Sequence, residues 1–274
     1  MIGAPALAAR AALRSGAGLV VVACPASIQL CVAGLCPCAT SIPLAEESGV
    51  LDLPASIEEF RGRGLLGAGK PSVAAIGPGL GRGNSRFDSE VLSLCEAFLE
   101  AEVPLVIDAD ALNALHKAGG NVKRGWNEVA WRRTVITPHP GELGRLQGIG
   151  TDEIQAQREA WAGRTAREMS SKMEKDVGRP VVVLKGAGTV VSDAERIYKN
   201  ATGNPGMATG GSGDVLTGVI AALIGQRMSP FDAAVLGVHV HGMAGDLAAK
   251  KLGEVSMTAS DLIDFLPDAF RRMK

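Results

Sequence analysis

The segment from Gly203 to Gly218, GNPGMATGGSGDVLTG, is rich in glycine and carries a single acid, Asp214. Glycines before a helix leave backbone N–H groups free to bind an anion, and the helix dipole favours negative charge at the same end. We therefore interpret Gly210, Gly211 and Gly213 as a phosphate-binding loop that opens a helix. A carboxylate in such a loop repels phosphate. Its presence makes sense if Asp214 accepts the proton of a hydroxyl that attacks the phosphate.

Asp214 is thus predicted to be a general base, and the helix dipole is expected to favour its ionised form. The plain alternative is an acid that stabilises the first helical turn by about 0.3–1 kcal/mol. Lys185, in VVLKGAGTVV, ends a predicted strand beside two glycines, and we expect it to contact phosphate. The sequence has no G-x-x-x-x-G-K-[ST] motif, which excludes a Walker-type nucleotide site.

Two acids stand together in VIDADALNAL, directly after another predicted strand. Asp108 and Asp110 could bind a hydrated magnesium ion or accept a hydrogen bond from a sugar hydroxyl. The alternative is that Asp110 caps the next helix. We expect Asp110 to cap that helix and Asp108 to face the site.

A histidine is held between two prolines in ITPHPGELGRL. One interpretation is that His139 acts as a fixed ligand contact or as a catalytic base. The other is that His139 belongs to a structural turn, with Glu142 stabilising the first turn of the helix that follows. The residues alone leave both interpretations open. IGPGLGRG, at residues 76–83, predicts a tight glycine turn rather than a dinucleotide fingerprint.

The elements that must position these residues follow from the hydrophobic pattern. Strands are predicted at 18–23, 72–77, 104–109, 133–138 and 180–186, several of them apolar at consecutive positions, as in strands buried on both faces. Helices are predicted at 5–15, 85–101, 151–174, 212–225, 230–251 and 261–273. This alternation predicts one domain, residues 1–274, with a parallel sheet covered by helices on both faces. Ligands of such sheets bind beyond the carboxyl ends of the strands, where the motifs lie.

Composition excludes several classes of function. The formal net charge of −1 offers no basic field for nucleic acid or for a membrane surface. Arg10 and Arg14 give the first apolar residues an amphipathic helical pattern rather than that of a signal peptide, which predicts a cytoplasmic protein. The cysteine cluster CVAGLCPC lacks the paired spacing of a zinc site. The remaining histidines are expected to be surface or core residues, with His116 at the surface and no metal shared by His239 and His241.

Five motifs resemble, in the same order, those of the ADP/ATP-dependent NAD(P)H-hydrate dehydratases, a family of the ribokinase-like superfamily. They are GPGLG, DADALN, TPHPGE, LKGAGT and GNPGMATGGSGDVLTG, and the resemblance covers residues 3–226. It implies a three-layer α/β/α ribokinase-like fold with a mainly parallel central sheet. Family members carry a further segment before Gly3, so the sheet is expected to lack the family's first strand. The family's frequent epimerase domain is absent, and no epimer interconversion is expected.

The resemblance also implies an activity. ADP or ATP would phosphorylate the hydroxyl of (6S)-NAD(P)HX, and elimination of phosphate would restore NAD(P)H. Asp214 would contact that hydroxyl, and Mg²⁺ would travel with the nucleotide, with no metal ligand assigned in the protein. The implied nucleotide-binding residues are Lys185, Gly186, Ala187, Gly188, Thr189 and Gly213, and the implied hydrate-binding residues are Ala4, Gly79, His139 and Asp214. Tetramers among relatives imply a homo-oligomer.

Two alternatives share the same residues. A small-molecule kinase of the superfamily would phosphorylate a vitamin-type alcohol and release a stable product. A non-catalytic adenine-nucleotide sensor would gain affinity by losing the repulsive charge of Asp214, so the presence of that acid argues against a sensor.

Overall fold

The computed structural model describes residues 1–81, 83–119, 131, 133–170 and 178–273. Its central sheet has the strand order β10-β9-β8-β7-β6-β5. In chain order the strands are β5 (Ala74–Ile76), β6 (Leu105–Ile107), β7 (Thr134–Ile136), β8 (Val181–Leu184), β9 (Val190–Ser192) and β10 (Ile197–Lys199). Strands β5 to β8 are parallel, and β9 and β10 are each antiparallel to their neighbour. The mainly parallel sheet is therefore confirmed.

The register of the parallel strands brings their carboxyl ends to one edge. Ile76 pairs with Ile107, Ile107 with Ile136, and Ile136 with Val182. The side chains of β6, β7 and β8 are buried at every position, which explains why their sequences are apolar or β-branched without alternation. The residues that follow the strands therefore meet above the same edge.

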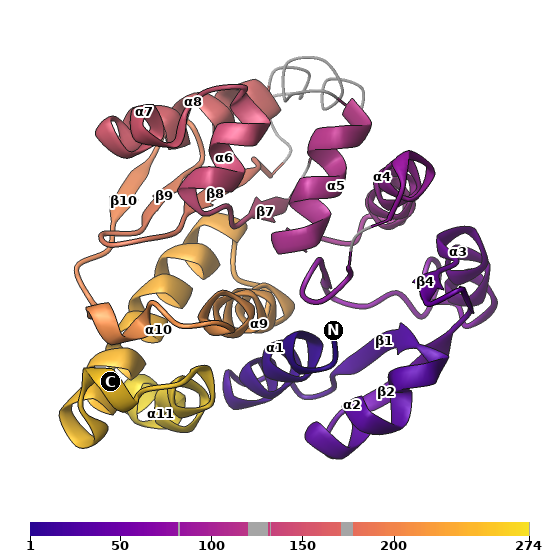
Figure 1. The fold of residues 1–274 in the computed structure, drawn as a ribbon, viewed down its shortest axis with the longest axis horizontal. Helices are drawn as coiled ribbons and strands as arrows, with labels where there is room; N and C mark the ends of the chain where they lie inside the picture. The colour runs from indigo at the N-terminus through magenta and orange to yellow at the C-terminus, as the bar shows by residue number, and fades with distance from the viewer. Residues whose placement is uncertain (82, 120–130, 132, 171–177, 274) are drawn as a thin grey trace.

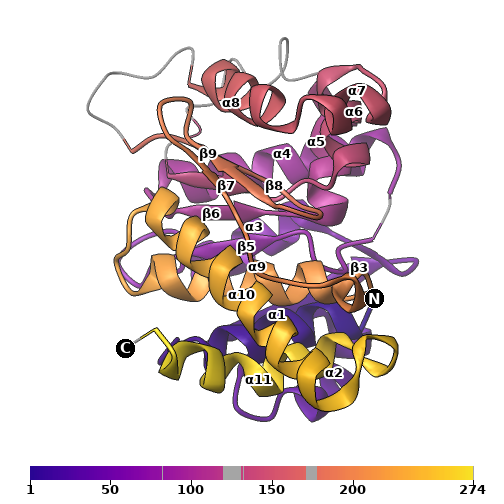
Figure 2. The same ribbon diagram turned by 90° about the vertical axis from the view of Figure 1, so that its left-hand side faces the viewer.

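Helices cover both faces of the sheet (Figure 2). One layer contains α4 (Ser85–Glu100), α5 (Ala109–Gly119), α6 (Pro140–Gln147), α7 (Thr151–Ala156) and α8 (Arg158–Met169). The other contains α9 (Ser212–Gly225) and α10 (Pro230–Leu252), backed by α1 (Gly3–Arg14) and α11 (Ala259–Arg271). Each layer has its own apolar cluster against the sheet. This is the predicted three-layer arrangement, and no helix among the described residues is long and apolar enough to cross a bilayer.

Helix α9 is apolar around nearly its whole circumference because it lies between the sheet and α1. The backbone of α1 approaches it closely at Gly218, where an added Cβ would lie 2.1 Å from the carbonyl oxygen of Ala8. Figure 1 shows the two helices side by side. This packing fixes the first turn of α9 relative to the first turn of α1.

The predicted helix over 151–174 is wrong in part, because it breaks between α7 and α8. Gln157 has φ −137° and ψ 47°, which is not helical. The break lets Arg158 reach the sheet, where its guanidinium donates to the carbonyl oxygen of Leu184 at 2.9 Å. Residues 171–174 of the prediction lie outside the described residues, as does Arg82 in the predicted turn at 76–83.

The strand predicted at 18–23 forms, but outside the central sheet. It is β1 (Val21–Pro25), which pairs in parallel with β2 (Thr40–Leu44) in a separate two-stranded sheet. Around this pair lie η1 (Ala26–Ile28), α2 (Gln29–Leu35), the hairpin β3 (Glu46–Glu47) and β4 (Val50–Leu51), and α3 (Leu53–Gly62). Among the described residues β5 has no strand on its outer side. Among the described residues, the edge of the sheet at β5 is therefore open.

Candidate functional site

The glycine-rich loop leads into α9 at the carboxyl edge of the sheet. Gly211 has φ +94°, a left-handed conformation that favours glycine, and an added Cβ there would lie 2.6 Å from Leu7 Cδ1. No side chain caps α9, so its first-turn N–H groups face outward without a side-chain acceptor. The loop therefore has the backbone geometry of an anion site.

Asp214 is half-buried in the first turn of α9. Burial, assisted by the charge of Asp108, raises its pKa to about 6, although Lys185 acts to lower it. Burial therefore acts against the ionised form that the helix dipole was expected to favour. At neutral pH most of the carboxylate is still ionised, and a base with a pKa near 6 accepts a proton more readily than an ordinary aspartate.

Lys185 lies against the glycine loop and is paired with a buried acid. Its Nζ is 2.5 Å from Asp108 Oδ1, and an added Cβ on Gly213 would lie 3.2 Å from the same Nζ. Asp108 is only 1% exposed, and its Oδ2 accepts a hydrogen bond of 2.7 Å from Thr217. Asp108 therefore faces the candidate site, as expected. Its ion pair holds Lys185 at the start of α9.

The turn after β8 depends on its glycines. Gly186 has φ +134° and Gly188 has φ +61°, and an added Cβ at Gly186 would lie 3.1 Å from Arg158 Nη1. The Thr189 hydroxyl donates to the Gly186 carbonyl oxygen at 3.0 Å. Ala187 is exposed at the tip of the turn. The five residues from Lys185 to Thr189 thus form a tight turn beside the start of α9.

A second glycine turn follows β5 and packs on the start of α1. Gly79 has φ +70°, and an added Cβ would lie 2.9 Å from Pro5 Cδ and 3.2 Å from Ala4 Cβ. The structure thus brings Ala4 and Gly79 together, with Ala4 buried. Asp110 is the second residue of α5, and its Oδ2 accepts from the N–H of Gly81 at 2.9 Å. The prediction that Asp110 caps the helix is wrong, because its carboxylate holds this turn instead.

His139 is the N-terminal cap of α6. Its Nδ1 accepts hydrogen bonds from the N–H groups of Gly141 (3.0 Å) and Glu142 (3.3 Å), and Glu142 Oε2 accepts from the N–H of His139 (2.7 Å). Burial and the charge of Lys185 lower the pKa of His139, which keeps the ring neutral and its Nδ1 an acceptor. The structural-turn interpretation is therefore confirmed. Since Nδ1 is occupied, a ligand can approach only the Nε2 side of the half-exposed ring, where Nε2 already lies 3.6 Å from Glu142 Oε1.

Three contacts at the candidate site were not predicted from the motifs. Arg158 donates to the carbonyl oxygens of Leu184 (2.9 Å) and Lys185 (3.3 Å) and so supports the turn after β8 from α8. Thr217 lies one helical turn after Asp214, and that spacing was the one available signal. His241 is 8% exposed under the loop, where it hydrogen-bonds to the backbone of Ser212, and burial lowers its pKa to about 4.

The remaining histidines agree only in part with expectation. His241 is a core residue and His239 lies 3.4 Å from the Tyr198 hydroxyl, as ordinary structural histidines do. His116 was expected at the surface, but it is half-buried and burial lowers its pKa. The prediction for His116 is therefore wrong: α5 packs against both α4 and α6, and the residue is only partly exposed.

Carboxylates near the site do not form a metal cage. Among the described residues no group of three or more His, Cys, Asp or Glu side chains could hold a metal ion. Both oxygens of Asp108 are occupied by Lys185 and Thr217, and Asp110 Oδ2 is occupied by Gly81. The donors therefore fit Mg²⁺ only as an ion bound mainly by the phosphates of a nucleotide.

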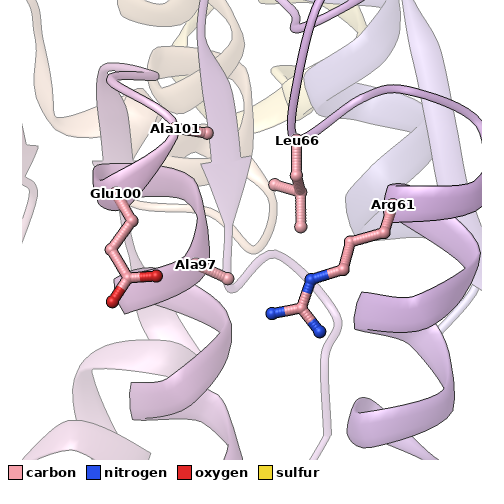
Figure 3. Close-up of a pocket in the computed structure, with 5 residues that line it drawn as sticks. All are labelled: Arg61, Leu66, Ala97, Glu100 and Ala101. Carbon is pink, nitrogen blue, oxygen red and sulfur yellow. The ribbon is translucent and has the colours of Figure 1, made fainter.

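A hollow between α3 and α4 lies away from this corner (Figure 3). It has a volume of about 170 Å³ and is lined by Arg61, Leu66, Ala97, Glu100 and Ala101. None of the predicted site residues lines it. The candidate site is therefore the corner formed by the start of α9, the turn after β8 and the end of β6.

Comparisons with known proteins agree with the motifs. A family model described as NAD(P)H-hydrate dehydratase matches residues 1–268. The bifunctional NAD(P)H-hydrate repair enzyme Nnr of Moorella thermoacetica is 41% identical over 281 residues, which cover 100% of this chain and 48% of that protein. Nnr of Escherichia coli is 38% identical over 269 residues, with 96% and 44% covered. The chain thus spans about half the length of the curated relatives it matches.

Solved structures show the same fold. The ADP/ATP-dependent NAD(P)H-hydrate dehydratase of Bacillus subtilis, co-crystallised with ATP/Mg²⁺, superposes with a TM-score of 0.76 at 27% identity, covering 100% of this chain and 86% of that one. A ribokinase-like superfamily protein of Enterococcus faecalis gives a TM-score of 0.74 at 23% identity, with 98% and 82% covered. The fold is ribokinase-like, as the resemblance implied.

Proposed function

The chain belongs to the NAD(P)H-hydrate dehydratase family, and from that premise we propose that it dehydrates (6S)-NAD(P)HX to NAD(P)H with ADP or ATP as co-substrate. The observation that carries the proposal is the corner in which Asp214 and Lys185 meet the uncapped start of α9. An anion-binding loop, a cation and a base with a pKa near 6 are the groups that phosphoryl transfer to a hydroxyl requires.

In the first step, the hydrate hydroxyl attacks the terminal phosphate of the nucleotide. The O–H bond breaks and its proton passes to Asp214, a new O–P bond forms, and the bond from that phosphorus to the leaving nucleotide breaks. The N–H groups of the loop and the ammonium of Lys185 stabilise the negative charge on the transferring group. Mg²⁺ bound with the nucleotide would supply further neutralisation of phosphate charge.

In the second step, the C–O bond of the phosphorylated hydrate breaks. Phosphate leaves with the bonding electron pair, and loss of a neighbouring ring proton restores the double bond of NAD(P)H. Phosphate is a far better leaving group than hydroxide, which is why consumption of a nucleotide is useful in a dehydration. The loop that holds the terminal phosphate of the nucleotide in the first step can hold the phosphate product in the second.

The remaining residues divide between two ligands in this proposal. The turn from Lys185 to Thr189 and Gly213 would hold the adenine nucleotide. Ala4, Gly79 and the Nε2 side of His139 would line the hydrate site. As part of the same proposal, residues 1–274 act as one domain in a cytoplasmic homo-oligomer.

The test is an assay with NADHX, Mg²⁺ and either ADP or ATP. We expect recovery of the absorbance of NADH with release of phosphate in equal amount. A stable phosphorylated product would indicate the small-molecule kinase alternative instead. Nucleotide binding without turnover of NADHX would indicate a sensor, and either outcome would contradict the proposal.

A further inference from the structure

Two carboxylates and one ammonium meet at the catalytic corner, yet only one ion pair forms. Lys185 Nζ lies 2.5 Å from Asp108 Oδ1. No ion pair of 4.0 Å or less joins Lys185 to Asp214 among the described residues. The ammonium is therefore held by the acid that is 1% exposed, and the half-buried acid that would act as base keeps no cation partner.

The position of Asp108 is determined by contacts on both of its oxygens. Oδ1 also accepts from the N–H of Ala109 at 2.8 Å, and Oδ2 accepts from the Thr217 hydroxyl at 2.7 Å. Ala109 has φ +50°, a conformation that costs a residue with a side chain on the order of 1 kcal/mol or more. Since the surroundings hold this strained turn in place, Asp108 is a rigid anchor for its partner.

We propose that Asp108 is a positioning residue, which anchors the Lys185 ammonium beside Gly213 and keeps it from pairing with Asp214. An ammonium has three N–H donors, and Asp108 uses one, so the others are free for an anion at the loop. Without Asp108, the Lys185 ammonium is free to turn toward Asp214, whose pKa its charge already lowers, and an ion pair there would weaken the base. The catalytic consequence rests on the proposed function, but the geometry does not.

The charges around Asp214 determine what removal of Asp108 should do. Three charged side chains act on Asp214, namely Asp108, Asp110 and Lys185, and helices packed against α9 also carry His241 and Arg10. The two acids raise the pKa of Asp214 and Lys185 lowers it. His241, with a pKa of about 4, is neutral near pH 7, and Arg10 is paired with Asp264 at 3.9 Å. Removing the charge of Asp108 should therefore lower the pKa of Asp214.

The direct test needs no substrate. The pKa of Asp214 is measured by ¹³C NMR of its carboxyl group, assigned by its loss in Asp214→Asn, in wild type, Asp108→Asn and Thr217→Val. The Asp108→Asn change keeps the shape of the side chain and loses its charge, whereas Thr217→Val removes one hydrogen bond and keeps both charges. We expect the pKa to fall by about 1 in Asp108→Asn and to stay within about 0.3 of wild type in Thr217→Val. An unchanged pKa in Asp108→Asn, or equal shifts in both variants, would overturn the proposal.

A second pair of variants covers the case in which Asp108→Asn does not fold. Removing one partner of a buried ion pair is costly, whereas removing both is often close to neutral. Lys185→Ala alone should raise the pKa of Asp214, because the charge of Asp108 is left without its partner. Adding Asp108→Asn to Lys185→Ala should lower it again, but by less than the same change does in the presence of Lys185, because no ammonium is left to pair with Asp214. A pKa that does not rise in Lys185→Ala, or an equal fall in the two backgrounds, would overturn the proposal.

Kinetics separate a positioning role from a purely structural one. With NADHX and ATP, Asp108→Asn should lower kcat by about tenfold or more and move the acidic limb of the pH profile to lower pH. In the Lys185→Ala background the same change should cost less than about twofold, because Asp108 acts through Lys185. If Asp108→Asn lowered kcat by the same factor with and without Lys185, the proposal that Asp108 acts through Lys185 would be contradicted. If wild-type protein does not turn over NADHX, the proposed function fails, and the NMR result still decides the role of Asp108.

Discussion

Helices α6 and α9 both begin at the carboxyl edge of the sheet, and their first three residues follow the same pattern. α6 opens with Pro140, Gly141 and Glu142, and α9 opens with Ser212, Gly213 and Asp214. In α6 the glutamate folds back onto the N-terminal cap, and His139 accepts from two backbone N–H groups. In α9 no side chain caps the helix, and the carboxylate of Asp214 has no hydrogen bond to a side chain or N–H group of the described residues.

The difference lies in where the hydrogen-bonding capacity of each helix end is used. α6 satisfies its own N–H groups, so its acid and its histidine are structural. In the proposed function, the start of α9 offers N–H groups to the nucleotide, and its half-buried acid accepts a proton. On that proposal, the same local sequence pattern serves stability in one helix and chemistry in the other. Matched substitutions at the two helix ends test this distinction.

The largest contrast is expected between the two acids. Asp214→Asn should lower kcat by about 10³-fold because it removes the general base, while nucleotide affinity stays equal or rises as a repulsive charge is lost. Glu142→Gln, at the equivalent position of α6, should keep kcat within about threefold. Steady-state kinetics and calorimetric titration with ATP measure both effects. Equal losses of kcat in the two variants would break the distinction between the helices.

The same aspartate variant should also change stability with pH. Because burial raises the pKa of Asp214 to about 6 from 3.8, its ionised form destabilises the folded protein. The penalty is absent below about pH 4 and develops as the pH rises through about 6. Asp214→Asn should therefore raise the Tm at about pH 8 and leave it unchanged at about pH 4. A Tm that rises equally at both pH values would indicate a cause other than the charge.

Removal of the cation at α9 should act mainly on the nucleotide. Lys185→Ala should weaken ATP binding by about 10–100-fold, the loss typical of a charge-assisted contact. Arg145, which bonds Asn113 Oδ1 at 3.1 Å beside α6, offers the control, and Arg145→Ala should leave ATP affinity unchanged. Calorimetric titration measures both. Unaltered affinity in Lys185→Ala would count against its role at the loop.

Substitution of the second residue of each helix is expected to have a smaller effect, which is purely steric. Gly213→Ala adds a Cβ 3.2 Å from Lys185 Nζ, and Gly141→Ala adds one 3.0 Å from His139 Cε1. Both crowd a flexible neighbour by a similar amount. We expect KM for ATP to rise about tenfold in Gly213→Ala and to stay within about twofold in Gly141→Ala. A similar rise in both would mean that the start of α9 is no more a nucleotide site than the start of α6.

The sequence predicts the parts of this comparison that depend on local pattern. Consecutive apolar residues correctly predict β6, β7 and β8, and the helix predicted at 212–225 has the observed bounds. Because carboxyl ends of parallel strands share an edge, Lys185 and Asp214 could be assigned to one site from the sequence alone. The capping role of His139 was one of two open interpretations.

Other features depend on contacts between distant residues, which no local pattern records. Asp108 is 77 positions from Lys185 and 109 from Thr217, and their network appears only in the folded chain. The pKa of Asp214 is raised by its burial and by the charge of the distant Asp108. The β1–β2 pair and the break at Gln157 likewise depend on which neighbours the segments meet.

The smallest effect on turnover is expected at the cap of α6. His139→Ala removes the acceptor of two N–H groups and should cost about 1 kcal/mol of stability at about pH 8. Because the pKa of His139 is lowered in the folded protein, the stabilisation by the cap is present above the ordinary histidine pKa of 6.5 and is lost as the pH falls through the lowered value. The difference in Tm between wild type and variant should therefore shrink at about pH 5.

The kinetic consequence of the same variant decides between cap and base. As a cap with one free edge toward the hydrate site, His139 should affect KM for NADHX by several-fold and leave kcat within about threefold. A catalytic base would instead contribute about 10²-fold or more to kcat. His139→Asn, whose side-chain oxygen can accept from the same N–H groups, should restore the Tm. A large fall in kcat that His139→Asn does not rescue would show that the start of α6 takes part in the chemistry, and the two helix ends would then differ only in degree.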